Sequence, residues 1–317
     1  MELPLPANAL EFDRTYGTDA ACQQALVHAR WPEGFRCPAC DHDRAYELRC
    51  RRAVVQCAAC KSQISLTAGT IFHGSKLPLR TLFRIVYMTV AEKSGTNAMA
   101  ISRQTGVSHP TALLWVRKVR SVMARRPREK LSGTVEVDES ILGRKSADQK
   151  GRRLAKNQAW VVILAEDKGD DGMGRVRLEM VERTNEEVLG SVVQRHVEEG
   201  SELRTDAWSS YRPLAKKGYS HDPRNLSASG KPAHEQLPLV HLVASLLKRY
   251  VGGILHGSWR HHWLPWLLAE FEFRLNRRRS RRRPLLFNRV MELGLALRPP
   301  TRYAMAEFAR LATCASL

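Results

Sequence analysis

The sequence predicts a multidomain α/β protein in which an N-terminal zinc ribbon and a helix-turn-helix precede a domain built on a mixed sheet. Three observations support this fold class: two Cys-x-x-Cys pairs, two helical patterns joined by a glycine turn, and a later run of strands that carries two aspartates. The 317 residues suffice for several domains. We place them at residues 1–72 (N-terminal helix and ribbon), 73–130 (helix-turn-helix), 131–290 (sheet domain) and 291–317 (C-terminal tail).

The composition is strongly basic. The chain carries 51 Lys and Arg against 32 Asp and Glu, a formal net charge of +19. A protein with this excess most often binds a polyanion, and nucleic acid is the first candidate, the alternative being a generally basic surface. No run approaches the roughly 18 apolar residues of a membrane span, and the first residues lack the pattern of a signal peptide. We therefore expect a cytoplasmic protein.

The two Cys-x-x-Cys pairs predict a structural zinc site. Their members are Cys37, Cys40, Cys57 and Cys60. Each pair turns the chain so that both thiolates face one ion, and four thiolates close a tetrahedral Zn²⁺ site. The short strands expected at residues 44–49, 53–56 and 63–67 are too small to bury a core, so the metal would supply folding energy. Cys22 and Cys50 are interpreted as spare thiols.

Three helices are expected after the ribbon. Apolar residues repeat at helical spacing over residues 77–92, Asn97 can cap a second helix, and Ser108 can cap a third that has Pro110 in its first turn. With Gly106 at the turn between the last two, this is the helix-turn-helix pattern, whose later helix enters the major groove of DNA. A plain three-helix packing unit is the alternative. The residues expected near bases or phosphates are His109, Thr111, Arg117 and Lys118.

The third segment changes to strands. The expected elements are strands at residues 135–142, 159–165 and 176–181, a helix at 185–198 and a strand at 203–206. Three strands, a helix and a strand is the ribonuclease-H order, in which the first and fourth strands are neighbours in the sheet. That adjacency would bring Asp138, at the end of the first strand, beside Asp206, at the end of the fourth.

Paired aspartates at strand ends in a basic chain predict a divalent-metal site. Mg²⁺ prefers carboxylate oxygens and keeps positions open for phosphate, and two such ions can clamp both oxygens of an in-line phosphodiester displacement. The alternative is that Asp138 and Asp206 are ordinary strand-end caps. A later helix, expected at residues 238–250, places His241 and Lys248 on one face, which is either a polar stripe toward a site or a solvated edge.

With these motifs in order, the sequence resembles the zinc-ribbon transposases of small bacterial insertion sequences, the ISXO-type group. The motifs that carry the resemblance are VEVDES, TDAWSSY, SLLKR and EFEFRLNRR, behind the ribbon. The resemblance spans about residues 31–283. It implies a DNA transposase with a ribonuclease-H-like catalytic domain that holds Mg²⁺ or Mn²⁺ through Asp, Asp and Glu or Asn, usually followed by Lys. Carried over by motif, these residues are Asp138, Asp206 and Lys248.

The third metal-binding position departs from the family pattern. Family members with Glu have it seven positions before the Lys, where this chain has His241, and members with Asn have it two positions before, where this chain has Leu246. Histidine can ligate a divalent ion but suits softer metals than Mg²⁺, and leucine cannot ligate at all. Glu235 on the preceding loop is a further candidate. Either His241 serves, or the copy is catalytically weakened or repurposed as a DNA-binding protein.

The resemblance also implies the partners. They are double-stranded DNA, as terminal inverted repeats and as target, and further copies of the chain in a homodimer or larger assembly on DNA. The expected location is the bacterial cytoplasm, in association with the nucleoid. A helix at residues 263–277 runs into a segment with six arginines at residues 277–283, which are expected to hold phosphates. The first three are Arg277, Arg278 and Arg279.

Overall fold

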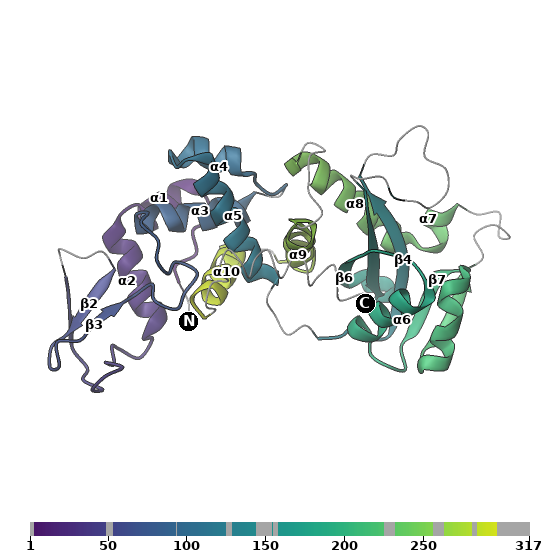
Figure 1. Ribbon diagram of the computed structural model, residues 1–317, viewed down its shortest axis with the longest axis horizontal. Helices are drawn as coiled ribbons and strands as arrows, with labels where there is room; N and C mark the ends of the chain where they lie inside the picture. The colour runs from purple at the N-terminus through teal and green to yellow at the C-terminus, as the bar shows by residue number, and fades with distance from the viewer. Residues whose placement is uncertain are drawn as a thin grey trace. The chain divides into compact units, whose positions relative to one another are not determined.

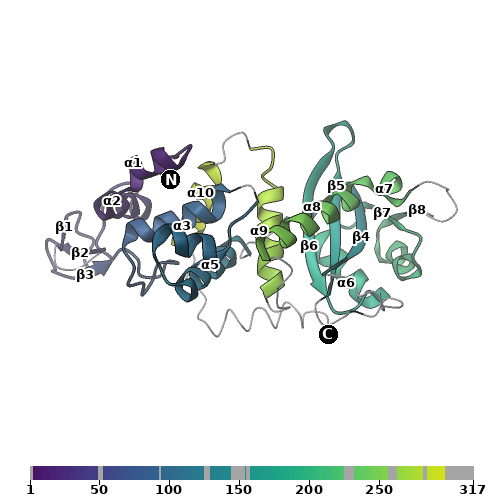
Figure 2. The ribbon, with the colours of Figure 1, turned by 90° about the horizontal axis from the view of Figure 1, so that it is seen from above.

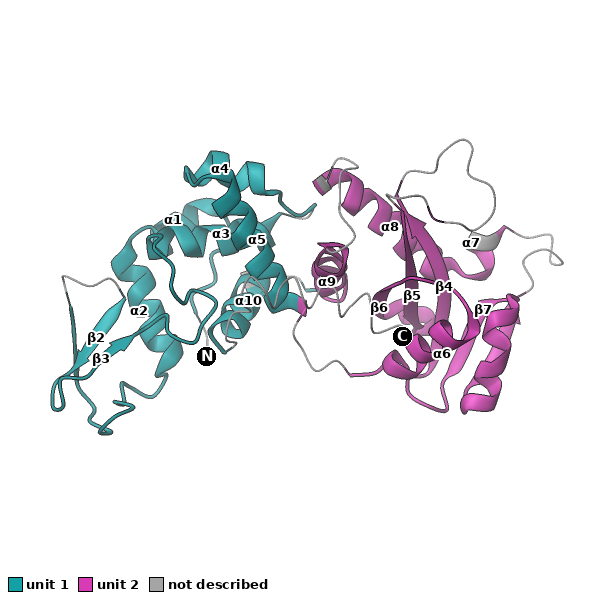
Figure 3. Ribbon diagram, viewed as in Figure 1, with its two compact units in different colours: residues 1–123, 280–301 teal, residues 124–279, 302–317 magenta. Residues whose placement is uncertain are grey.

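The computed structural model describes residues 3–48, 53–92, 94–124, 129–143, 154, 158–224, 232–255, 263–280 and 284–296. It divides into two compact units, one built from residues up to 123 together with helix α10 (Pro284–Ala296), the other from residues 124–279 (Figure 3). The first unit takes in the predicted ribbon domain and most of the predicted helix-turn-helix domain, and residues 284–290, which we placed in the sheet domain, belong to it as well. Figure 1 and Figure 2 show the elements of both units.

The first unit contains the helices that the sequence predicted before residue 124, together with one that it did not predict. They are α1 (Ala9–Tyr16), α2 (Asp19–Arg30), α3 (Leu79–Ala91), α4 (Ala98–Thr105) and α5 (His109–Ala124). The side chains of Asn8, Thr18 and Asn97 each accept a hydrogen bond from the amide three residues later and so cap α1, α2 and α4. Gly106 ends α4 at φ 71°, a left-handed conformation that glycine adopts without steric cost. Helices α1 and α10 were not predicted.

Helix α10 completes the core of the first unit. Phe287 is fully buried, and its ring centroid lies 5.6–6.3 Å from four aromatic rings of α1 and α3. These rings belong to Phe12, Tyr16, Phe83 and Tyr87. Asn288 donates to the carbonyl of Leu3, and the amide of Ile71 donates to the carbonyl of Gly294. The N-terminal core is therefore closed by a helix from near the other end of the chain.

The second unit is a five-stranded mixed sheet between two helical layers. Its strands are β4 (Thr134–Leu142), β5 (Ala159–Asp167), β6 (Met173–Val181), β7 (Glu202–Asp206) and β8 (Ser220–Arg224), in the order β6-β5-β4-β7-β8. Strand β4 is antiparallel to β5 and parallel to β7. Helix α6 (Glu186–His196) and the 3-10 segment η2 (Ser209–Lys217) cover one face, and α8 (Pro238–Leu255) and α9 (Leu264–Leu275) cover the other (Figure 2).

The predicted adjacency of the first and fourth strands is confirmed. Val137 pairs with Thr205 in the parallel register, so Asp138 and Asp206 are the next residues of their strands. The prediction that Asp138 ends its strand was wrong, because β4 continues to Leu142 through pairing with β5. What ends near Asp138 is the pairing with β7, so the two aspartates still meet where the parallel neighbour stops.

Polar side chains at the C-terminal end of α9 and directly after it bond to backbone groups on the outer edge of β6. The Asn276 amide donates to the Val176 carbonyl (2.9 Å) and accepts from the Val176 amide (2.7 Å), as a neighbouring strand would. Glu272, one turn earlier, accepts from the amide of Leu178 and pairs with buried Arg177. The EFEFRLNRR motif therefore covers a strand edge whose unpaired groups could otherwise pair with another chain. Across the part of the chain that the structure describes, no helix combines the length and hydropathy of a membrane span.

Candidate metal centres and nucleic-acid interface

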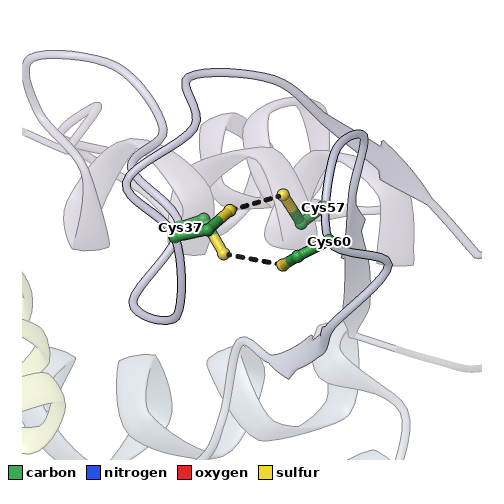
Figure 4. A group of neighbouring side chains, drawn as sticks. Cys37, Cys57 and Cys60 are labelled. Carbon is green, nitrogen blue, oxygen red and sulfur yellow. Dashed lines mark hydrogen bonds between the residues drawn. The ribbon is translucent and has the colours of Figure 1, made fainter.

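The four predicted cysteines meet at one point of the ribbon. Strands β1 (Ala45–Glu47), β2 (Val54–Cys57) and β3 (Gln63–Ser65) form an antiparallel sheet, and the two Cys-x-x-Cys turns face each other beside it. The Sγ atoms of Cys37 and Cys60 are 3.6 Å apart, as are those of Cys40 and Cys57, and all four lie within 4.8 Å of one another (Figure 4). Zinc–sulfur bonds of about 2.3 Å in a tetrahedron require sulfur separations of about 3.8 Å, so the four thiols fit one Zn²⁺.

The two turns repeat the same local geometry. Asp41 and Lys61, each directly after the second cysteine of its pair, are left-handed at φ 59° and 61°. The amide of the first cysteine in each turn bonds the carbonyl five residues later. Arg36 and Gln56, each directly before its pair, donate to the carbonyls of Asp41 and Lys61. This repetition indicates that each half of the site is preformed by its own backbone.

Cys22, the other early cysteine that the structure describes, stands apart from this site. Cys22 is buried in α2 and is not a member of the four-thiol group, as predicted, and burial raises the pKa of its thiol to about 12. Within the four-thiol group, hydrogen bonding to Ser62 lowers the pKa of the Cys60 thiol to about 6. Cys50 lies outside the described residues.

The two aspartates share one face of the second unit's sheet. Val135, Val137 and Leu203 are buried in the core that packs on α6. Side chains alternate along a strand, so Asp138 and Asp206 point to the opposite face, which α8 covers. Both are partly exposed, and each is oriented by a backbone amide: Glu139 donates to Asp138 Oδ1 (2.8 Å) and Trp208 to Asp206 Oδ1 (3.2 Å).

A buried tyrosine lies against the acidic edge, the name we give to Asp138, Glu139 and Asp206. The Tyr211 hydroxyl donates to Glu139 Oε2 at 2.5 Å. Burial, followed by the charge of Glu139 and its hydrogen bond, raises the pKa of Tyr211 well above its usual value, and the charges of Asp138 and Asp206 add to the rise. The sequence contained this tyrosine at the end of TDAWSSY, but nothing in its spacing indicated that Glu139 would be its partner.

Helix α8 brings His241 to the first aspartate. The His241 Nε2 atom lies 3.9 Å from Asp138 Oδ2. Lys248 is exposed two turns further along α8, Leu246 packs on the apolar core, and Glu235 is exposed in the short helix α7 (Ala233–Gln236). The candidates for the third ligand are His241, Leu246 and Glu235. Among the contacts of the described residues, the one that joins a candidate to an aspartate is that of His241 with Asp138.

The acidic edge is more open than the zinc site. Within the described ranges, the four cysteines are the only group of three or more His, Cys, Asp or Glu ligand atoms that all lie within 4.8 Å of one another. Asp138, Asp206 and His241 therefore do not form a closed single-ion site. Two ions about 3.5–4 Å apart need ligands spread over a wider space, and two carboxylates on neighbouring strands, where the pairing of those strands ends, fit that arrangement.

Guanidinium groups at the end of α9 engage the backbone of the second unit. Arg277 lies over the Phe273 ring, 4.0 Å from its centroid, and donates to the Phe273 carbonyl. Arg278 donates to the carbonyls of Met173 and Gly174, and Arg279 to that of Asp171. Both of these side chains remain exposed. The other arginines of this segment, at 281–283, lie outside the described residues.

The candidate DNA-contacting residues lie on α5. His109 is exposed at its first position, and Thr111 and Arg117 are partly exposed. The Lys118 ammonium lies 4.5 Å from the centroid of the Trp115 ring, and burial lowers its pKa. Lys118 therefore packs against its own helix, whereas His109 is open to a partner.

Comparisons with known proteins agree with these features. A family model described as an ISXO2-like transposase domain matches residues 130–276, and one described as a transposase zinc-ribbon domain matches residues 17–63. Together they cover more than half of the chain. A solved structure, a pre-cleavage Mos1 transpososome, is 13 % identical over 66 % of this chain and 78 % of that chain, at a TM-score of 0.26. None of the curated proteins compared with the chain matches it.

Proposed function

The chain belongs to the zinc-ribbon transposases with an ISXO2-like domain, and from this premise we propose that it cleaves the terminal inverted repeats of an insertion sequence and transfers the strands to target DNA. The observation that carries the proposal is the parallel register that makes Asp138 and Asp206 neighbours on one open face. We assign the second unit to the ribonuclease-H-like folds on its strand order. The proposed setting is the bacterial cytoplasm and nucleoid.

The first unit is proposed to recognise the DNA ends. Its four thiols suit structural Zn²⁺, and α4, the Gly106 turn and α5 have the order of a helix-turn-helix. The exposed start of α5 at His109 and Thr111 would enter the major groove, and Arg117 would lie toward phosphates, which Lys118 would reach only by leaving the Trp115 ring. A homodimer or larger assembly would hold two element ends at once.

The chemistry is proposed to depend on the acidic edge. Divalent cations held by Asp138 and Asp206 would activate the attacking hydroxyl and stabilise the leaving oxygen, with no covalent intermediate on the protein. The amides of Glu139 and Trp208 hold the two carboxylates in place, which limits the rearrangement needed on binding. Lys248, exposed on α8, would contact phosphate.

His241 is proposed as the third ligand. Imidazole offers one softer nitrogen and no negative charge, so the site should work better with Mn²⁺ than with Mg²⁺. The alternative function, a catalytically weakened copy that only binds DNA, is favoured by the same observation.

Cleavage of a duplex that carries the repeats flanking the gene separates these functions. The proposal predicts metal-dependent nicking at the repeat ends and joining to a target plasmid, and His241→Glu should raise the rate in Mg²⁺. Binding without nicking would support the DNA-binding alternative, and nicking without joining would indicate a nuclease. If His241→Glu and His241→Ala both behave like the wild type in each metal, His241 is not a ligand.

A further inference from the structure

A buried carboxylate next to the proposed site has no role in the chemistry described so far. Glu136 lies on β4 two residues before Asp138, on the same face of the sheet, and its residue exposure is 2 %. Its Oε2 atom accepts hydrogen bonds from the backbone amides of Leu239 (2.8 Å) and Val240 (3.0 Å), both in the first turn of α8. A carboxylate buried this deeply requires such partners.

Glu136 accounts for the start of α8. The first turn of a helix has amides without helical partners, and α8 has no acidic residue of its own there. Pro238 has no amide hydrogen, and the backbone amides of Leu239 and Val240 donate to Glu136. The backbone amide of His241 donates to the Leu237 carbonyl and so makes the first hydrogen bond of the helical series. The carboxylate from β4 therefore caps a helix that begins about a hundred residues later, where its negative charge also faces the positive end of the helix dipole.

The same contact lies beside the pair formed by Asp138 and His241. Asp138 is the next residue along β4 on the same face, about 6.6 Å further on. His241 directly follows Val240 on α8 and places its Nε2 atom 3.9 Å from Asp138 Oδ2. The contact between Glu136 and the α8 amides thus joins β4 and α8 two residues before Asp138 on the strand and one residue before His241 on the helix.

We infer that Glu136 is a positioning residue: its carboxylate docks the first turn of α8 on β4 and thereby fixes His241 against Asp138. The functional significance of this inference rests on the proposed function, in which His241 is the third metal ligand that Glu136 holds in place. The docking itself is a property of the free protein.

The test measures the Asp138–His241 contact without metal or DNA. His241 ring resonances are assigned in the zinc-loaded, full-length protein by comparison with His241→Ala, and their change on Asp138→Asn is recorded at a pH where the ring is neutral. The same change is then recorded in Glu136→Leu, which has no acceptor, and in Glu136→Gln, which keeps one. Glu272→Leu is the matched control, because Glu272 is also buried and also accepts a backbone amide, but on β6.

The expected result is that the Asp138→Asn effect on His241 falls at least twofold in Glu136→Leu and persists in Glu136→Gln and in the control. Glu136→Asp, which is one methylene shorter and keeps the charge, should show an intermediate loss and serves if Glu136→Leu does not fold. An undiminished effect in every folded Glu136 variant would overturn the inference. Because no cleavage is measured, an inactive enzyme would contradict the proposed function and leave this result standing.

Discussion

Replacing Phe287 by alanine should destabilise the first unit, although the second unit separates residue 287 in the sequence from the rest of the first unit. The Phe287 side chain is fully buried among four aromatic rings from α1 and α3. Phe→Ala changes in close-packed cores cost about 3–5 kcal/mol, because transfer free energy is lost and a cavity remains. Rings on several sides cannot all collapse into that cavity, so we expect about 4 kcal/mol, a large part of the 5–15 kcal/mol that stabilises a typical domain.

The assay is native-state hydrogen exchange of the full-length protein. In Phe287→Ala, the amides of α3 should exchange roughly 500-fold or more faster, while those of β5 in the second unit should be unchanged. Leu285→Ala on the same helix is the control, since Leu285 is 46 % exposed and its loss should cost under about 0.5 kcal/mol. Equal protection of α3 in the wild type and Phe287→Ala would refute the account of α10 as part of the N-terminal core. A fragment of residues 1–123 should likewise lack the wild-type protection of α3.

Three further results are expected. Cys57→Ser should abolish the single bound Zn²⁺ measured by elemental analysis, and Cys22→Ser should leave it unchanged, since Cys22 lies outside the four-thiol group; retained zinc in the first variant would contradict the site. Replacing arginines 277–279 by alanine should shallow the slope of log K against log salt by about 0.9 for each phosphate that the variant no longer neutralises, whereas lysine replacements should preserve it; an unchanged slope would place them away from DNA. Burial alone would raise the pKa of Glu166, but hydrogen bonds from Arg175 outweigh burial and lower the pKa in the folded protein. The ionised Glu166 therefore stabilises the fold fully above its unfolded pKa of about 4.3, and this stabilisation is lost as the pH falls through the lower folded pKa. Urea unfolding of the second unit should show a loss of stability in that acidic range, and Glu166→Gln should make the loss smaller.

Features set by local spacing could be predicted from the sequence. The zinc ligands follow from two Cys-x-x-Cys turns, each of which forms its own half of the site. The adjacency of β4 and β7 follows from the order of three strands, a helix and a strand, because that order predicts that the first and fourth strands are neighbours. In both cases the information lies in neighbouring residues or in element order, so no distant contact had to be known.

Features set by distant contacts could not be predicted. Glu136 had the right alternation to share a face with Asp138, but its partners are amides of a helix about a hundred residues away. Helix α10 was not predicted, and the aromatic cluster around Phe287, which shows where it packs, joins it to residues far away in the sequence. The EFEFRLNRR motif indicated a helix, whereas the pairing of Asn276 with the β6 edge depends on the tertiary fold.

The proposed function depends above all on Asp138 and Asp206 together holding the divalent metal that cleaves DNA. The most direct measurement compares cleavage and binding of a terminal-repeat duplex by Asp138→Asn, Asp206→Asn and, as a control, Asp170→Asn in the exposed η1 turn (Gly169–Asp171). We expect that each of the first two variants loses cleavage by at least about 100-fold while its DNA affinity stays within about twofold of the wild type, and that the control cleaves normally. Wild-type cleavage by either Asp138→Asn or Asp206→Asn would contradict the assignment.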